Sequence, residues 1–363
     1  MEIDLFGLVL GTGKNPEYHD ILRDYLAKNP EKVDTKNTKG FTPLMLACCN
    51  SDTLSTEETV KILIEAGAST NAVSKMLNTA LLLSCYHIGR GSTEGTIRIL
   101  LQYGVDPNVS NIHGLTPLHY AVQYSRINII HMLLKAGANI NAEDNEENTP
   151  LMYAASLSGK TGTEDAVKLL VDYGADLNKR NLKGSNALAA AIYNQKNSTE
   201  NTVQILIDCG ADLEIDISGG SILLLACRLG AMYPTLTYSS NIVRSLIYHG
   251  ADITKVDHDG NGIFKYNEHV GDIIKIIEEW GVHKYLKKIF SSAILKYIRH
   301  ISEDFKFADG RIGQKITIYK LGLSERSREE IYRSILEKNP EILDYLNIRS
   351  PDEVGKLREY TDQ

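Results

Sequence analysis

The sequence predicts an all-α protein in which short helical units stack into one elongated solenoid. One phrase recurs along the chain, and it reads STEETVKILIEAGAS from Ser55, STEGTIRILLQYGVD from Ser92 and STENTVQILIDCGAD from Ser198. Each copy places aliphatic residues at helical spacing before a glycine, and a second helical pattern lies between copies. Repetition of one helix-turn-helix unit indicates a solenoid, because a single unit cannot bury its apolar face alone.

The repeated phrase predicts one amphipathic helix in each unit. A β-branched residue lies seven positions before the final glycine, a leucine four positions before it and another aliphatic residue three positions before it; the first copy has Val60, Leu63 and Ile64. Positions i, i+3 and i+4 share one helical face, so this stripe faces the core. A glycine with positive φ then ends each helix. These glycines are Gly67, Gly104, Gly137, Gly174, Gly210 and Gly250.

A Thr-Pro-Leu pattern predicts the other helix of each unit. In Thr116-Pro117-Leu118 the threonine is a good N-cap, and the proline fits the first helical position, where no N–H is needed. Three residues after the leucine the side chain is always small, which lets neighbouring helices approach closely. These small residues are Ala47, Ser84, Ala121, Ala154, Ala191 and Ala226.

The segment GLTPLHYAVQYSRINIIHMLLKAGANIN, from Gly114 to Asn141, resembles the ankyrin repeat. The resemblance covers residues 38 to about 256 and implies helix pairs joined by hairpins. We therefore expect an ankyrin-repeat solenoid of about eight units over residues 1–283, with degenerate end units at 1–37 and 257–283, because each terminal face meets water. Residues 284–363 are not repetitive, and we expect a small C-terminal helical module there.

The style of the repeats resembles one group of ankyrin proteins in particular. Four-residue inserts and phrases such as ENTPLMYAAS and TEDAVKLLVDYGADLN are similar to the ankyrin proteins of amoeba-infecting giant viruses of the mimivirus kind. Poxvirus and intracellular-bacterial ankyrin proteins are weaker matches. The resemblance implies a viral protein that acts in the cytoplasm of an infected host cell.

The turn between the two helices of a unit varies in length. From the first-helix leucine to the second-helix aliphatic residue the spacings are 16, 16, 12, 16, 15 and 20 residues, so most units carry insertions there. Ser-Thr-Glu marks where the second helix resumes, since Ser or Thr caps a helix and Glu favours its positive end. The alternative is that the inserts form a second exposed edge that a partner reads. The longest insert, residues 228–240, then offers Tyr233 and Tyr238.

Composition excludes several classes of function. The net charge of −7 is not that of a nucleic-acid binder, and no apolar run approaches the roughly 20 residues of a membrane-spanning helix. The acidic start lacks the basic region of a signal peptide. Five cysteines without a C-x-x-C pair indicate free thiols in a reducing compartment. We expect a cytoplasmic monomer that binds neither nucleic acid nor a membrane.

Several residues that suggest chemistry fit structural roles better. LVLGTGKN near the start has Leu8 and Asn15 where a phosphate loop needs Gly and then Ser or Thr. One core position of the repeat holds Cys48, Cys85 and Cys227. His119 is similar to the histidine that bonds within and between units of the family. No nucleophile–base set stands out from the repeat, so we expect no cofactor, no metal site and no enzymatic activity.

The predicted function is non-catalytic binding of a protein partner. In ankyrin proteins partners usually contact the hairpin tips and the first helices, and here the tips differ strongly in charge and size. An equally open alternative is that exposed tips drift without constraint. Host hydroxylases modify similar repeats at the position of Asn108, Asn141 and Asn178, although turn bonding is the better interpretation. The candidate binding residues are Met76, His113, Glu146, Arg180, Lys183, Asp216, His258, Tyr233 and Tyr238.

The tail offers two further hypotheses. VHKYLKKIFSSAILKYIRHI, from Val282, has a basic helical face, which we expect to be solvated or packed on the acidic solenoid rather than on a membrane or nucleic acid. In poxvirus ankyrin proteins a C-terminal helical module recruits ubiquitin ligases, although the Leu-Pro opening of that module is absent here. An adaptor that recruits a ligase, or an enzyme with its active site in residues 284–363, are the alternatives.

Overall fold

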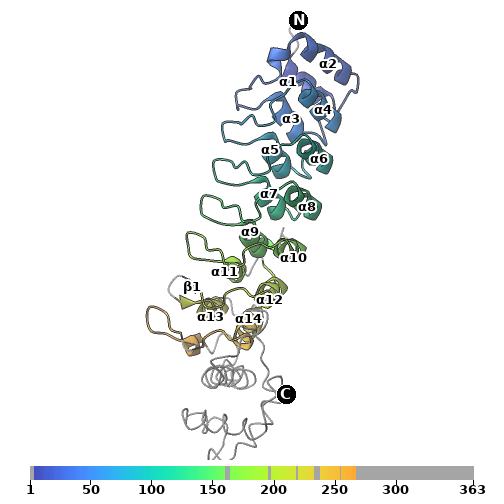
Figure 1. Ribbon diagram of the computed structural model, residues 1–363. Helices are drawn as coiled ribbons and strands as arrows, with labels where there is room; N and C mark the ends of the chain where they lie inside the picture. The colour runs from blue at the N-terminus through green and yellow to red at the C-terminus, as the bar shows by residue number, and fades with distance from the viewer. Residues whose placement is uncertain are drawn as a thin grey trace, which may run out of the picture.

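The computed structural model is a single row of stacked helix pairs (Figure 1). It describes residues 4–159, 164–194, 198–217, 220–232, 238–253 and 255–266. The first helices form one layer, the second helices form the other, and the loops between units project to one side (Figure 1). This arrangement confirms the predicted all-α solenoid. The expected C-terminal module and most of the last degenerate unit lie outside the described residues.

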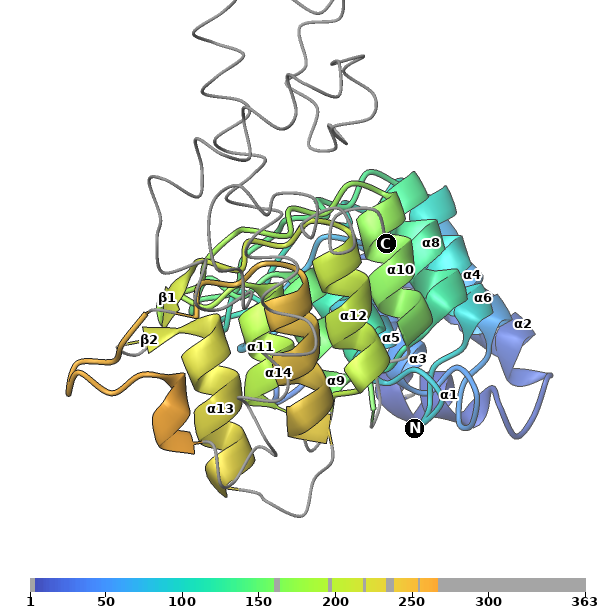
Figure 2. The ribbon, with the colours of Figure 1, turned by 90° about the horizontal axis from the view of Figure 1, so that it is seen from below.

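Each unit contributes a first helix, an inter-helix turn and a second helix. The first helices are α1 (Leu5–Gly11), α3 (Pro43–Cys49), α5 (Ala80–Tyr86), α7 (Pro117–Gln123), α9 (Pro150–Leu157), α11 (Ala187–Tyr193) and α13 (Ile222–Met232). The second helices are α2 (Tyr18–Lys28), α4 (Glu57–Glu65), α6 (Glu94–Gln102), α8 (Ile127–Lys135), α10 (Glu164–Asp172), α12 (Glu200–Asp208) and α14 (Tyr238–Tyr248). Figure 2 shows α4, α6, α8, α10 and α12 side by side in one layer.

Short elements complete the described chain. The 3-10 helices are η1 (Pro30–Lys32) and η2 (Ile263–Tyr266), and the strands are β1 (Asp216–Ile217) and β2 (Gly220–Ser221). The two strands pair antiparallel, with Asp216 opposite Ser221. In the other described units the hairpin between helices is a turn closed by two backbone bonds, such as those from the Asn111 N–H to the Leu115 carbonyl at 3.1 Å and from the Gly114 N–H to the Asn111 carbonyl at 2.9 Å.

The local signals of the sequence define the helix ends. The hydroxyl of Thr42 accepts a bond from the Met45 N–H, and Thr79 caps α5 in the same way. Two residues after the end of each second helix from α4 to α14 lies a glycine whose φ is between 73° and 92°. Side chains other than glycine rarely adopt this left-handed conformation. The predicted capping and termination are therefore confirmed.

The core runs through all units as one continuous apolar layer. The predicted second-helix stripe is buried, and Val60 and Leu63 are both fully shielded from solvent. The small residues of the first helices are also buried, which allows α9 and α11 to pack closely. The core position with cysteines is confirmed as well, because Cys48, Cys85 and Cys227 are fully buried. Burial raises the pKa of the Cys227 thiol to about 12, so it stays protonated and unreactive at neutral pH.

The first unit is more regular than its sequence predicts, because α1 and α2 form a helix pair that packs on α3 and α4. The glycine-rich stretch after α1 serves this packing. The Gly13 N–H donates to the Leu54 carbonyl at 3.1 Å. A Cβ at residue 13 would lie 2.6 Å from the Thr53 carbonyl oxygen, so only glycine fits. The stretch is the end of a helix and a turn, as expected, and it brings the turns of two units into contact.

A core substitution tests the shared apolar layer. Leu133 is fully buried in α8, and Leu133→Ala should lower the free energy of unfolding by about 2–5 kcal/mol, because it leaves a cavity. The matched control is Leu182→Ala, since Leu182 is 66% exposed and its truncation should change stability by less than about 0.5 kcal/mol. Urea unfolding followed by circular dichroism measures both, and similar losses for the two variants would contradict the arrangement.

Candidate protein-binding surfaces

The hairpin tips are held rigidly by side chains at the start of each turn. The Oδ1 atom of Asn111 accepts from the N–H groups of His113 and Leu115 at 2.9 and 3.2 Å. Asn181 does the same with Lys183 and Ser185, both at 3.0 Å. The same turn position in other units holds Asn37, Ser74, Asp144 and Asp257. Each of these six tips therefore has a fixed backbone conformation before any partner arrives.

Neighbouring tips are joined by backbone hydrogen bonds. The Ile112 N–H donates to the Met76 carbonyl at 3.2 Å, and the Asn145 N–H donates to the His113 carbonyl at 3.0 Å. A third bond of 3.0 Å joins the Leu182 N–H to the Glu146 carbonyl. The tips from residue 76 to residue 182 thus form one row, called the tip row here, which lies along one side of the solenoid (Figure 1). The structure brings the candidates Met76, His113, Glu146 and Lys183 together on this row.

The tip row has an apolar end and a charged end. Met76, Leu77 and Ile112 are exposed on adjacent tips, and Leu77 adopts a positive φ of 57°. Farther along, Lys183 lies 3.7 Å from Glu146. Ion pairs on exposed surfaces contribute only about 0–1 kcal/mol, so these side chains can exchange partners readily. The sequence did not single out Leu77, because nothing local shows that its side chain points to solvent.

The other candidates are distributed around this row. The guanidinium of Arg180 lies 3.6 Å from the Asp212 carboxylate, and Asp216 lies 3.5 Å from Lys255. His258 is exposed on the last described hairpin. Tyr233 and the side chain of Tyr238 lie outside the described residues. Binding by any of these residues stays a prediction.

The three asparagines that follow the second helices are structural. Asn108 accepts from the Asn139 N–H at 2.7 Å, and Asn141 accepts from the Asp176 N–H at 2.9 Å. Asn178 repeats the contact with the Asp212 N–H at 2.8 Å. Each side chain joins one unit to the next, which confirms the turn-bonding interpretation.

The opposite side of the solenoid carries the inter-helix turns, a row called the insert ridge here. The Ser-Thr-Glu phrases begin the second helices, as predicted. The Oγ1 atom of Thr93 accepts from the Thr96 N–H at 3.0 Å, and Thr56 and Thr199 cap their helices identically. The glutamate has a second role that the sequence did not reveal. Glu57 accepts from the Thr93 hydroxyl of the next unit at 2.6 Å, and Glu164 accepts from Thr199 at 2.7 Å.

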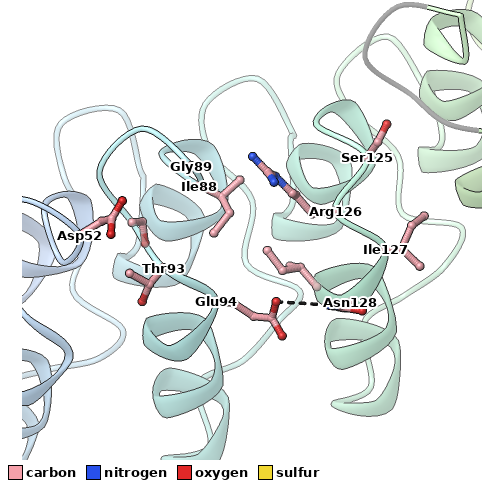
Figure 3. A pocket seen from close by; sticks show the side chains of 11 residues that line it. Asp52, Ile88, Gly89, Thr93, Glu94, Ser125, Arg126, Ile127 and Asn128 are labelled. Atoms are coloured by element: carbon pink, nitrogen blue, oxygen red, sulfur yellow. Dashed lines mark hydrogen bonds between the residues drawn. The ribbon is translucent and has the colours of Figure 1, made fainter.

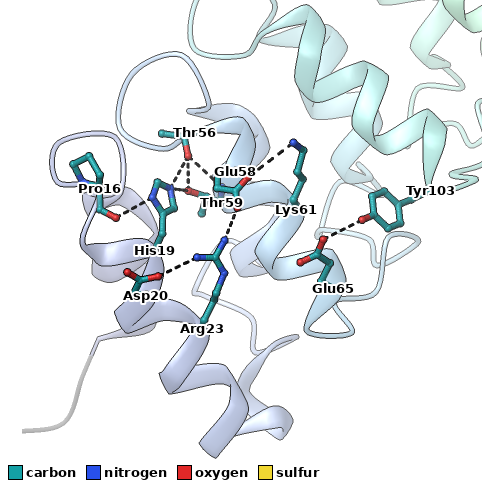
Figure 4. A network of polar contacts seen from close by, with 10 residues as sticks. All are labelled: Pro16, His19, Asp20, Arg23, Thr56, Glu58, Thr59, Lys61, Glu65 and Tyr103. Atoms are coloured by element: carbon teal, nitrogen blue, oxygen red, sulfur yellow. Dashed lines mark hydrogen bonds and ion pairs between the residues drawn. The ribbon is translucent and has the colours of Figure 1, made fainter.

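The first interface uses a histidine where later ones use glutamate. The Nε2 atom of His19 lies 2.8 Å from the Thr56 hydroxyl and 3.2 Å from that of Thr59 (Figure 4). Beside these bonds, Arg23 pairs with Glu58 of the next unit and with Asp20 of its own helix (Figure 4). Threonine at the second-helix N-cap is therefore bonded across the unit boundary whether the neighbouring side chain is an imidazole or a carboxylate.

His119 is a structural residue with no catalytic geometry. It is 1% exposed, its Nδ1 atom accepts from the Thr116 N–H at 3.2 Å, and its Nε2 atom lies 3.2 Å from the Asn148 carbonyl of the next unit. Burial lowers the pKa of His119, although the Asn148 carbonyl and Asp144 act in the opposite direction. Nε2 donates its proton to Asn148, so the ring has no free base to offer a substrate.

The described part of the chain includes no group of His, Cys, Asp and Glu arranged to hold a metal ion. Among the helices described, none combines the length and the apolar character that crossing a bilayer requires.

Comparison with known proteins identifies the repeat. A family model of ankyrin repeats, which spans three copies, matches residues 13–111, 55–144, 89–181 and 151–257. The B-cell lymphoma 3 protein homolog of Mus musculus is 31% identical over 161 residues, which is 44% of this chain and 34% of that protein.

Viral proteins are also similar to the chain. A putative ankyrin repeat protein of Acanthamoeba polyphaga mimivirus is 42% identical over 166 residues, covering 45% of this chain and 39% of that protein. A putative ankyrin repeat protein of Fowlpox virus is 30% identical over 169 residues, covering 46% of this chain and 47% of that protein. The matched part of the chain spans from about a third to about half of the length of these three relatives.

The turn at Asp144 makes a pH-dependent contribution to stability. Burial raises the pKa of this carboxyl, but bonds from the Asn148 and Glu146 N–H groups and from the Tyr153 hydroxyl outweigh it, so the pKa is lowered. A lowered pKa stabilises the fold at neutral pH, and this contribution is lost as the pH falls through the folded-state pKa. Asp144→Asn should therefore cost about 1 kcal/mol at pH 7 and less at pH 3, which lies below the ordinary pKa of an aspartate.

Urea unfolding at the two pH values measures this difference. Asparagine occupies the same turn position at Asn111 and Asn181, so the backbone of the variant should be unchanged. Asp24→Asn, at an exposed position on α2, is the control and should behave like the wild type at both pH values. An equal loss at pH 7 and pH 3 would show that the charge of Asp144 contributes nothing.

Proposed function

The chain belongs to the ankyrin-repeat family, and from that premise we propose that it is a non-catalytic scaffold that binds a protein partner along its tip row. Ankyrin repeats are in general protein-interaction modules without an enzymatic centre of their own. A rigid scaffold that presents variable loops is the usual arrangement of a binding surface. The sequence-based expectation of a protein-binding role is confirmed at this general level, and the particular surface is the proposal.

One observation carries the proposal. Met76, Leu77 and Ile112 expose apolar side chains on two tips that a backbone hydrogen bond joins. Apolar side chains gathered on a rigid surface commonly mark an interaction site, because binding a partner removes their apolar surface from water. The charged tips beyond them, with Glu146 and Lys183, would form the polar rim that protein interfaces typically have.

The proposed setting is the cytoplasm of an infected host cell, with a host protein as the partner. The similarity to ankyrin proteins of mimivirus and Fowlpox virus supports a viral origin. The thiols support a reducing compartment, because none of the five cysteines is in a disulfide and four of them are buried. The chain would act there as a single copy, with its partner lying along the tip row.

Affinity purification of the partner, with the full-length chain as bait, tests whether the tip row is the binding surface. The double variant Met76→Asp and Ile112→Asp places charge at the apolar end and should lose the partner, with recovery falling at least tenfold. The control is the double variant Lys61→Ala and Lys168→Ala on the second-helix face, which should recover the partner as the wild type does. Equal recovery by all three proteins would show that the tip row is not the binding surface.

The ligase-recruiting alternative is separated in the same experiment. The full-length chain and a chain ending at residue 283 are compared, because the tail from residue 284 is the proposed recruiting module. If the tail recruits a ligase, ubiquitin-ligase subunits should appear with the full chain and be absent from the shorter one. Enzymatic turnover by the full chain that is lost on removing the tail would instead support the enzyme alternative and contradict a purely non-catalytic scaffold.

A further inference from the structure

A notch interrupts the insert ridge between α6 and α8 (Figure 3). Its volume is about 490 Å³, within the range of about 300–1,000 Å³ that small ligand sites occupy. One wall is the insert from Ile88 to Glu94, and the other is the short turn from Ser125 to Ile129. Asp52 of the preceding unit lies at the far end. This cavity is separate from the tip row, which lies on the hairpin side of the solenoid.

At the preceding boundary, between the units of α4 and α6, two inserts contact each other in the corresponding space. The Asp52 N–H donates to the Gly91 carbonyl at 3.1 Å, and the Thr96 hydroxyl donates to the Ser51 hydroxyl at 2.6 Å. A Cβ at residue 91 would lie 2.4 Å from the Cys49 carbonyl oxygen, so the two inserts touch. The unit of α7 and α8 has a spacing of 12 residues where its neighbours have 16, and it therefore lacks four residues of insert.

The missing insert leaves the start of α8 without a cap. Arg126 is the N-cap residue and makes no side-chain capping bond. In the other units with Ser-Thr-Glu, a threonine hydroxyl accepts the N–H of the third helical residue, for example that of Thr96. Ile129 is the equivalent residue, and its N–H has no acceptor in the part of the chain that the structure describes. Ile129 is 2% exposed and is one of the residues that line the notch.

Among the described residues, Glu94 lacks the threonine hydroxyl partner that Glu57 and Glu164 have. Glu57 and Glu164 each accept from a threonine hydroxyl of the next unit, at 2.6 and 2.7 Å. The contacts of Glu94 with the described residues are a long one of 3.4 Å from the Asn128 side chain across the notch and an ion pair with Arg98 (Figure 3). An acceptor is therefore positioned where a hydroxyl donor is missing.

Ser92 and Arg126 also line the notch. Ser92 is 2% exposed, and its buried hydroxyl makes no hydrogen bond with any described residue, as is also true of Ser55 at the equivalent position of the preceding unit. The guanidinium of Arg126 lies against the backbone of Gly89, and none of the ion pairs among the described residues includes it. Gly89 has a φ of 71°, and a Cβ there would be 2.3 Å from an Arg126 nitrogen, so this close approach depends on glycine.

We propose that the notch binds an extended segment of a partner protein in which a serine or threonine is followed by an acidic residue. The hydroxyl accepts from the Ile129 N–H and donates to Glu94, as Thr93 does with Thr96 and Glu57. The acidic side chain meets Arg126 and the positive end of α8. Asp52 at the far end repels a second acid there, which fixes the direction of the segment.

The chain itself shows that this chemistry fits. Ser-Thr-Glu segments occupy the equivalent space before α4, α6 and α12, with their threonines as caps. A partner segment would supply from outside the residues that this unit lacks. The proposal does not depend on the tip row, so a partner could be held at both places or at either one.

A synthetic peptide tests the notch directly. The probe is acetyl-GRGSTEG-amide, a copy of residues 89–95, titrated into the isotope-labelled full-length chain. The backbone amide resonances of Asn128 and Ile129 should shift, with a dissociation constant on the order of 1 mM for so short a segment. The peptide acetyl-GRGSVQG-amide, which lacks the hydroxyl and the charge, should bind at least tenfold more weakly. Equal binding of the two peptides, or no shift at Asn128 and Ile129, overturns the proposal.

Two protein variants localise the interaction. Arg126→Glu should weaken binding of acetyl-GRGSTEG-amide at least tenfold, whereas Lys135→Glu makes the same charge change at the other end of α8 and should leave binding unchanged. The Met76→Asp and Ile112→Asp variant should also bind the peptide like the wild type, which separates this test from that of the tip row. Unaltered binding by Arg126→Glu, or equal weakening by both α8 variants, contradicts the assignment.

Discussion

No unit of this protein can bury its apolar face without a neighbour, and every other feature of the structure depends on that constraint. Val60, Leu63 and Leu100 are fully shielded only because the helices of the next unit cover them. The small first-helix residues, such as Ala121 and Ala154, set the distance at which this covering occurs. Apolar surface buried at each boundary stabilises the row of units by roughly 25 cal/mol per Å².

Close packing fixes the register of the units, and the polar contacts between units follow from it. Three separate rows of such contacts run along the solenoid. They are the backbone bonds between tips, the asparagine contacts that include Asn108 and Asn141, and the threonine–glutamate bonds of the insert ridge. Each bond contributes only about 1 kcal/mol to stability, yet together they give both edges of the solenoid a fixed conformation, which lowers the cost of ordering them when a partner binds.

Local signals were sufficient to predict most of the fold. Thr42 and Gly67 define helix ends by bonds within a few residues, and the cysteine at Cys85 takes its core position from the repeat alone. The candidate site was predicted less completely. The bond between Glu57 and Thr93 joins residues 36 positions apart, and no single unit shows it. Leu77 and Leu182 are exposed because of how neighbouring tips lie, which the sequence of one tip does not determine.

The notch shows how a repeat can lose four residues at little energetic cost. The core residues of α8 keep the same sequence spacing to Gly137 as in the other units. Shortening the turn before α8 therefore leaves Ile130 and Leu133 fully buried. The shortened unit lacks one helix cap and one bond between units. Loss of the cap costs about 0.5–2 kcal/mol. In a solenoid this loss stays between two neighbours, because each unit contacts only the next. An uncapped helix, an unmatched glutamate and an arginine are thereby gathered in one cavity, and a segment from outside can complete all three.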